Sequence, residues 1–121
     1  MRELLEWWNK EAHQLSPVIT SGIIHYRFEA IHPFGDGNGR TGRMLALWEL
    51  YRRGFDNHHI FSVDEVYWEK RPLYYKNLDL VRKEGDDLTG WLEYTAEAVS
   101  YTHLIKFFMP IIRKIRRLKN Y

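Results

Sequence analysis

The sequence predicts an all-α fold, a compact helical bundle formed by one domain of 121 residues. Three kinds of observation predict it. Apolar residues recur at intervals of three and four, which is the spacing of an amphipathic helix. Prolines and glycines interrupt this spacing where helices are expected to begin and end. We find no convincing strand pattern and no internal repeat.

The first three helices are delimited by these interruptions. A short amphipathic helix opens at residues 4–8 and should end before Ser16. Pro17 suits the first turn of a second helix, with Ser16 as its cap. Pro33 must end that helix, because the residue before a proline avoids the helical region. A glycine-rich loop follows, and a third helix then runs to Gly54.

The second half of the chain continues the helical pattern. Ser62 opens a sequence with the form of a capping box, which predicts a fourth helix from there to about Lys83. After a polar turn, Asp87 or Thr89 can cap a last helix. Residues 106–121 hold six basic residues and no acidic one, and we expect a basic helical tail there. We interpret this tail as the solvated face of an amphipathic helix and expect neither nucleic acid nor a membrane as a partner.

Composition narrows the class of protein. The chain has no cysteine, which excludes a disulfide framework, a thiolate metal site and a cysteine nucleophile. No apolar run approaches the length of a membrane span, and the first ten residues do not resemble a secretory signal. We therefore expect a cytoplasmic protein.

The chemistry is concentrated in residues 32–43, which read His-Pro-Phe-Gly-Asp-Gly-Asn-Gly-Arg-Thr-Gly-Arg. Glycines where a loop enters a helix let backbone N–H groups approach a phosphate closely. Arg40 and Arg43 lie three residues apart, so they project to nearly the same side of the helix and suit phosphate oxygens. Asp36 offers a carboxylate for Mg²⁺, and His32 offers a base that titrates near neutral pH. The segment predicts a cradle for Mg²⁺ and a polyphosphate beside a general base.

This segment resembles the Fic motif, H-P-F-x-[D/E]-G-N-G-R-x-x-R, and matches every specified position. The resemblance extends from about residue 3 to about residue 105. It includes residues 4–8, residues 25–28, the Tyr74–Tyr75 pair and residues 88–93. A glycine-rich loop alone is a weak signal, whereas a complete motif with matching flanks is specific. The chain is therefore identified as similar to Fic-family domains, which implies a Fic-type helical bundle.

The resemblance also implies an activity, the transfer of AMP from ATP to a Ser, Thr or Tyr hydroxyl of a target protein. It implies that His32 deprotonates this hydroxyl, that Phe34 is buried and anchors the loop, and that Asp36 holds Mg²⁺ between the α- and β-phosphates. The resemblance further implies the contacts with ATP. Gly37, Asn38 and Gly39 would form an anion hole, with the Asn38 side chain on the α-phosphate. Arg40 would bind the distal phosphates and Arg43 the γ-phosphate, and Tyr74 and Tyr75 would lie near the adenosine.

The sequence departs from the family pattern in two places. A β-hairpin flap that holds the target usually precedes the first helix, and an inhibitory helix often supplies a glutamate to the second motif arginine. Neither pattern is matched, so we expect a fragment of a longer protein that binds ATP but transfers AMP weakly. Other activities with the same loop stay open: transfer of a related phosphate group, removal of AMP, or nucleotide binding without turnover. A homo-oligomer stays open as well.

Overall fold

The structure, a computed structural model, describes residues 1–55 and 57–101, except for the side chains of residues 57–62. Residues 89–101 are helical. The elements before them are α1 (Arg2–Lys10), the 3₁₀ helix η1 (Ala12–Gln14), α2 (Pro17–Ile31), α3 (Asn38–Arg52), α4 (Asn57–Glu69) and α5 (Arg71–Lys83). No strand occurs in these ranges, which confirms the all-α prediction. The expected basic tail at residues 106–121 lies outside the described residues.

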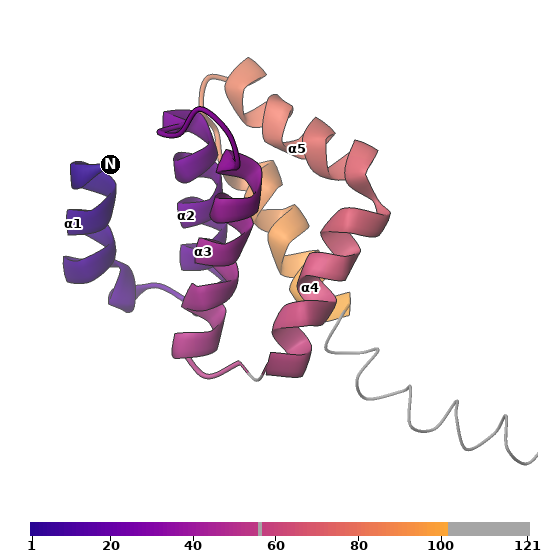
Figure 1. Ribbon diagram of the computed structural model, residues 1–121, viewed down its shortest axis with the longest axis horizontal. Helices are drawn as coiled ribbons and strands as arrows, with labels where there is room; N and C mark the ends of the chain where they lie inside the picture. Colours follow the sequence, from indigo (N-terminus) through magenta and orange to yellow (C-terminus); the bar gives the residue numbers. More distant parts are fainter. Residues whose placement is uncertain (56, 102–121) are drawn as a thin grey trace, which may run out of the picture.

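Helices α2 and α3 form the centre of the bundle. They run antiparallel, are joined at one end by residues 32–37, and pack more extensively than any other pair of labelled helices (Figure 1). Helix α1 lies on one side of this pair, and α4 and α5 lie on the other. The hydroxyl of Ser21 donates to the carbonyl of Ala46 at 3.0 Å, and the Trp91 indole donates to the carbonyl of Gly22 at 2.8 Å. These bonds tie α2 to α3 and to the helical residues 89–101.

The core is aromatic and lies between the central pair and the helices that follow it. Trp91, Tyr67 and Tyr74 are almost completely buried and pack at ring-centroid distances of 5.2–6.5 Å. Burying one large apolar side chain stabilises a fold by about 1.5–3 kcal/mol. The buried members of the cluster are Tyr26, Leu47, Leu50, Val63, Tyr67, Tyr74, Val81, Trp91, Tyr94, Ala98 and Val99.

The prediction of one fourth helix from Ser62 to Lys83 is wrong. Helix α4 begins at Asn57, so Ser62 lies within it and does not cap it, and the chain breaks at Lys70 before α5 begins. Pro72 explains the break: within an uninterrupted helix it would remove one backbone hydrogen bond and its ring would clash with the preceding turn. In the first turn of α5 a backbone N–H has no partner within the helix, so the N–H that Pro72 lacks costs no helical hydrogen bond.

The other predicted caps, Ser16 and Asp87, lie at or next to the starts of their helices, but only Asp87 makes a capping bond with its side chain. Ser16 occupies the N-cap of α2 without a capping bond from its side chain. Its carbonyl instead accepts from the backbone N–H and the hydroxyl of Thr20. Asp87 accepts from the backbone N–H of Thr89 at 2.9 Å and from its hydroxyl at 2.7 Å. The start of the last helix is thus capped by one of the two expected residues.

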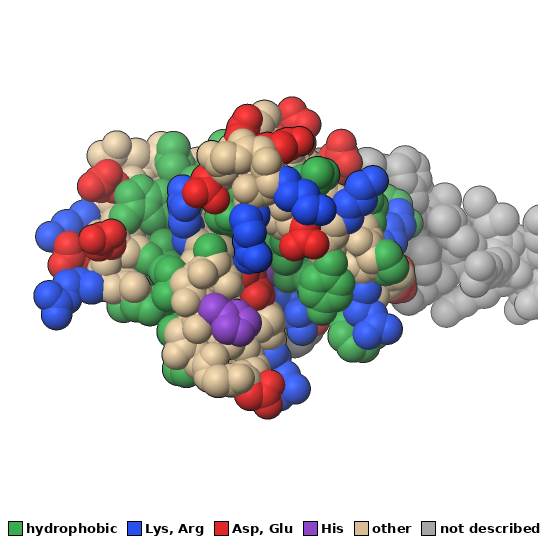
Figure 2. Space-filling model, turned by 90° about the horizontal axis from the view of Figure 1, so that it is seen from above, with side chains coloured by type: hydrophobic (Ala, Val, Ile, Leu, Met, Phe, Trp, Pro, Cys, Tyr) green, Lys and Arg blue, Asp and Glu red, His purple; other side chains and the backbone are tan. Residues whose placement is uncertain are grey.

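Acidic and basic side chains are interspersed on the face that carries residues 32–37, seen from above in Figure 2. No large patch of a single sign dominates this view, so an anion site on this face would depend on a few neighbouring residues.

Across the described residues, no helix combines the length and the apolar character that crossing a bilayer requires.

His25 gives the fold a predictable pH dependence. It is completely buried, and burial, assisted by the Arg43 charge, lowers its pKa from 6.5 to about 3. Below pH 6.5 the unfolded chain binds a proton that the folded chain excludes, so the free energy of unfolding falls as the pH drops toward 3. The slope approaches 1.4 kcal/mol per pH unit. Between pH 7 and pH 5 the loss from this group should be about 2 kcal/mol.

Urea unfolding at the two pH values measures this loss. His25→Gln cannot take up the proton, and all other titrating groups are shared by the two chains. The variant should therefore lose about 2 kcal/mol less than the parent chain between pH 7 and pH 5. Equal losses in the two chains would show that His25 does not stay neutral in the folded state.

Candidate active site

The candidate active site begins where α2 ends. His32 adopts a left-handed conformation (φ 51°, ψ 57°) and its backbone N–H donates to the Phe28 carbonyl at 3.0 Å. Pro33 cannot extend the helix, as the sequence predicted. Gly37 is also left-handed (φ 79°), a conformation that glycine adopts without steric cost, and α3 begins directly after it. The two left-handed residues therefore enclose a tight connection, with His32 at the end of α2 and Gly37 at the start of α3.

Asn38 closes this connection. It is 3% exposed, and its side-chain oxygen accepts from the backbone N–H of Phe34 at 2.9 Å while its Nδ2 donates to the Phe34 carbonyl at 2.6 Å. The amide thus fixes the backbone of the loop from the first residue of α3. Contact of the same side chain with the α-phosphate stays a prediction.

Phe34 does not anchor the loop from inside the core, and that expectation is wrong. The side chain is 53% exposed and rests against Phe28, with the ring centroids 6.1 Å apart. The two bonds from Asn38 hold the Phe34 backbone at the surface, so one side of its ring faces solvent. Backbone hydrogen bonds, rather than burial of the phenyl ring, fix the loop.

Asp36 lies exposed at the tip of the loop. Its Oδ1 accepts from the Gly37 backbone N–H at 2.8 Å. The described residues contain no group of three or more metal-ligating side chains. A single exposed carboxylate suits Mg²⁺, which binds through one or two carboxylates and takes waters and phosphates as its other ligands. Binding of Mg²⁺ at Asp36 stays a prediction.

The two motif arginines extend from the first turns of α3. Arg40 is exposed, and Arg43 is less exposed, at 21% of its side chain. The Arg43 Nε lies 3.4 Å from the Asp64 carboxylate of α4. Its Nη1 lies 3.6 Å from the point that a Cβ on Gly39 would occupy. The guanidinium is therefore held at Nε while its outer nitrogen faces the motif backbone.

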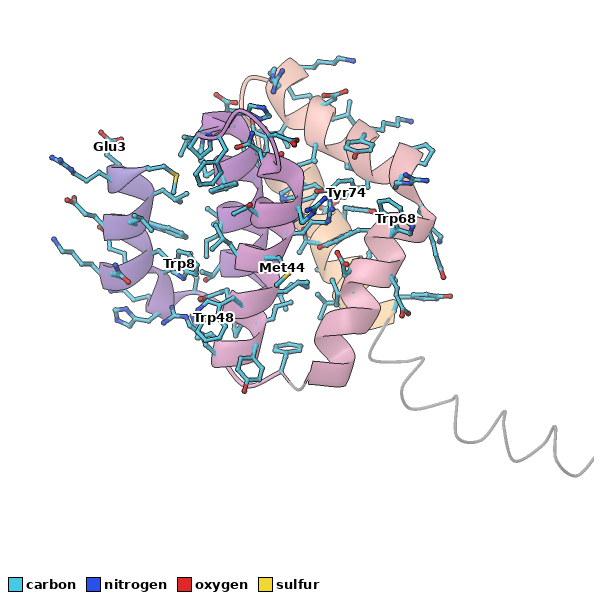
Figure 3. All side chains as sticks on the ribbon, in the orientation of Figure 1. Glu3, Trp8, Met44, Trp48, Trp68 and Tyr74 are labelled. Carbon is cyan, nitrogen blue, oxygen red and sulfur yellow. The ribbon has the colours of Figure 1, made fainter. Side chains whose placement is uncertain are left out.

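The two predicted adenosine contacts have different environments. Tyr74 is 2% exposed, whereas Tyr75 is 55% exposed, and their rings meet edge to face at 5.2 Å. Both line a small cleft with Arg43, and the other lining residues are Tyr67, Trp68 and Arg71. Figure 3 shows Tyr74 between α5 and α3, with Trp68 further out on α4. The structure thus brings Tyr74 and Tyr75 to the second motif arginine, with Tyr75 alone open to a bound molecule.

Glu29 belongs to this site and was missed by the sequence analysis. Its Oε1 is buried and has no hydrogen-bond partner among the described residues. Burial raises the pKa of Glu29, while the charges of Arg43 and His32 lower it. A Cβ on Gly42 would lie 3.0 Å from this oxygen, so glycine here allows the close approach of α2 and α3. The only signal in the sequence was an acidic residue one helical turn before His32.

Comparison with known proteins finds similarity to Fic proteins. The sequence model of the Fic/DOC family matches residues 1–50, which include the whole motif. The chain is 33% identical over 98 residues to protein adenylyltransferase fic-1 of Caenorhabditis elegans, covering 80% of this chain and 18% of that protein. It is 38% identical over 103 residues to protein adenylyltransferase Fic of Drosophila mojavensis, covering 84% of this chain and 19% of that protein.

The chain thus spans about a fifth of the length of these relatives. No solved structure matches it significantly. The matched stretches contain the loop and the helices on both sides of it, and the loop carries the complete motif in one local structure. The chain therefore belongs to the Fic/DOC family.

Proposed function

We propose that this chain is the catalytic domain of a protein adenylyltransferase, which transfers AMP from ATP to a Ser, Thr or Tyr hydroxyl of a target protein. One observation carries the proposal. Residues 32–43 form a single corner in which His32 ends α2 while Arg40 and Arg43 extend from the first turns of α3. The curated relatives named above are adenylyltransferases, which supports the same activity here.

The reaction requires one bond to form and one to break. The acceptor oxygen attacks the α-phosphorus, the bond between the α-phosphorus and the bridging oxygen breaks, and pyrophosphate leaves. His32, exposed at the end of α2, accepts the hydroxyl proton. Positioning and charge stabilisation contribute most of the rate in such transfers, because little covalent chemistry falls to the protein.

The ATP phosphates would lie along the start of α3. Backbone N–H groups from Gly37 to Gly39 and the partial positive charge of the helix N-terminus would stabilise the charge on the α-phosphate. Arg40 would bind the distal phosphates and Arg43 the γ-phosphate, which suits the direction of its Nη1. Asp36 would hold Mg²⁺, which neutralises charge on the α- and β-phosphates when it is bound.

Labelling with two forms of ATP tests the proposed function. The chain is incubated with Mg²⁺, a heat-inactivated cell lysate and ATP labelled at either the α- or the γ-phosphorus, beside the same mixture without the chain. AMP transfer leaves protein labelled by the α-form only, on the chain itself or on a lysate protein. Label from the γ-form would indicate phosphoryl transfer, and label from neither would indicate a module that binds nucleotide without turnover.

Asp36 provides a separate prediction on the metal. Asp36→Asn should remove the part of ATP affinity that depends on Mg²⁺, because it neutralises the exposed carboxylate at the tip of the loop. Calorimetric titrations of ATP with and without Mg²⁺ measure this difference. Asp79→Asn, which neutralises an exposed aspartate on α5, is the matched control and should retain the full Mg²⁺ effect. Unchanged Mg²⁺ dependence in Asp36→Asn would place the metal on other residues.

A further inference from the structure

A polar pair lies within the aromatic core, where an apolar pair would ordinarily pack. His25 of α2 is enclosed by the rings of Tyr67, Tyr74 and Trp91, at centroid distances of 5.6, 5.5 and 5.1 Å. Its Nε2 shares a hydrogen bond of 2.5 Å with the Tyr74 hydroxyl. Its Nδ1 is buried without a partner in the described part of the chain. Burial of an imidazole with one unpaired nitrogen destabilises a fold, so this pair is not explained by packing alone.

The pair reaches the motif through Arg43. Tyr74 and Arg43 line the same small cleft. Burial raises the pKa of the Tyr74 hydroxyl, and the nearby Arg43 charge opposes part of that rise. Arg43 also lies close enough to His25 for its charge to disfavour the protonated imidazole. Because His25 stays neutral, it shares a hydrogen bond with Tyr74 without adding a second positive charge beside Arg43.

The contacts on Arg43 then have distinct directions. Asp64 pairs with Nε from α4, and Tyr74 of α5 lines the same small cleft as Arg43. Nη1 is directed to Gly39 at the start of α3. The Asp64 carboxylate is 46% exposed, and an ion pair of that kind holds an arginine weakly. The Tyr74 hydroxyl is buried with its partner His25, so Tyr74 is the better-fixed of these two neighbours of Arg43.

We propose that His25 and Tyr74 form a buried positioning pair that holds the Arg43 guanidinium toward the motif loop, ready for the γ-phosphate of ATP. Tyr74 is then a positioning residue that acts through Arg43, rather than an adenosine contact. Because this pair orders Arg43 before ATP arrives, the arginine side chain loses less conformational freedom when ATP binds. The ATP part of this inference rests on the proposed function, whereas the ordering of Arg43 does not.

Two readouts on Tyr74→Phe test the inference. The first is ¹⁵N relaxation of the Arg43 Nε–H group in the ligand-free chain. Its order parameter should fall from near 0.85, typical of a rigid group, to below about 0.6. The second is affinity for ATP–Mg²⁺ and ADP–Mg²⁺ by calorimetry. Affinity for ATP should fall about tenfold, because an ordered partner of a charged group is lost. Affinity for ADP, which has no γ-phosphate, should change less than about twofold.

Tyr94→Phe is the matched control. Tyr94 is also a buried tyrosine of the same core, but its hydroxyl has no hydrogen-bond partner among the described residues. The control should leave both readouts unchanged. His25→Phe, which removes the nitrogen that orients Tyr74, should reproduce both effects of Tyr74→Phe. In an Arg43→Gln background, Tyr74→Phe should cause no further loss of ATP affinity.

The outcomes separate this inference from the proposed function. An Arg43 order parameter that is unchanged in Tyr74→Phe would overturn the inference. Equal losses of ATP and ADP affinity would also overturn it, because they indicate a general structural role. Loss of Arg43 order with no change in ATP affinity would support the positioning of Arg43 and contradict its assignment to the γ-phosphate.

Discussion

His32→Ala is expected to reduce AMP transfer by about 10²–10⁴-fold while ATP–Mg²⁺ affinity changes by no more than a few-fold. His32 is exposed at the end of α2, whereas the two motif arginines, Arg40 and Arg43, extend from α3. A general base at this place accepts a proton only as the acceptor oxygen attacks, so its loss lowers the rate and not the binding of ATP. Transfer is measured with α-labelled ATP, and affinity by calorimetry.

The backbone at His32 requires a second variant. Its φ of 51° disfavours alanine, so His32→Ala can disturb the loop as well as remove the base. Asparagine tolerates this conformation better, and His32→Asn should therefore lose transfer to the same extent with an undisturbed loop. His13→Ala, which removes an exposed histidine from η1, is the control. Full transfer by His32→Asn would exclude His32 as the general base.

Local sequence signals predicted the first half of the fold well. Pro17 and Pro33 delimit α2, and the glycine-rich stretch marks the connection to α3, because each of these residues restricts or frees the backbone at its own position. The capping signal at Ser62 failed because a four-residue pattern also occurs by chance inside a helix. Pro72 is the residue whose backbone requires the break between α4 and α5.

The candidate site was predictable only where one segment contains it. Residues 32–43 carry His32, Asp36 and both arginines within one connection and the first turns of α3, so their grouping follows from the sequence, whereas their roles stay predictions. Glu29 and the contact between Tyr74 and His25 depend on how α2, α3 and α5 pack, which no short pattern encodes. Phe34 was expected in the core from its residue type, but hydrogen bonds from Asn38 decided its position.

Glu49 is expected to contribute more to stability than any other single carboxylate among the described residues. Its side chain is 0% exposed and accepts from the Trp8 indole at 2.7 Å, from the Arg52 Nε at 2.6 Å and from the Arg53 Nη1 at 3.1 Å. Arg53 also donates to the Leu15 carbonyl at 2.8 Å. Helix α1 and the segment after it are thus tied to the far end of α3 through one carboxylate, with Trp8 directed from α1 toward α3 (Figure 3).

Glu49→Ala should therefore lower the free energy of unfolding by about 3–5 kcal/mol, the range for breaking a buried charge network from one side. The lower end is expected, because the side chains of Arg52 and Arg53 are 39% and 20% exposed and can turn to water. Trp8→Phe removes one of the three donors and keeps an aromatic ring, so it should cost about 1–3 kcal/mol. Urea unfolding measures both losses.

The same variant separates stability from the site. Glu49 lies in the last turn of α3, whereas the motif occupies its first turns, so the folded fraction of Glu49→Ala should bind ATP–Mg²⁺ with nearly the affinity of the parent chain. Calorimetry at a temperature where the variant is still folded tests this, with unfolding followed by circular dichroism. A stability loss below about 1 kcal/mol would show that the three donors are satisfied as well by water as by Glu49. A large loss of ATP affinity in the folded variant would show instead that the far end of α3 controls the conformation of the motif loop.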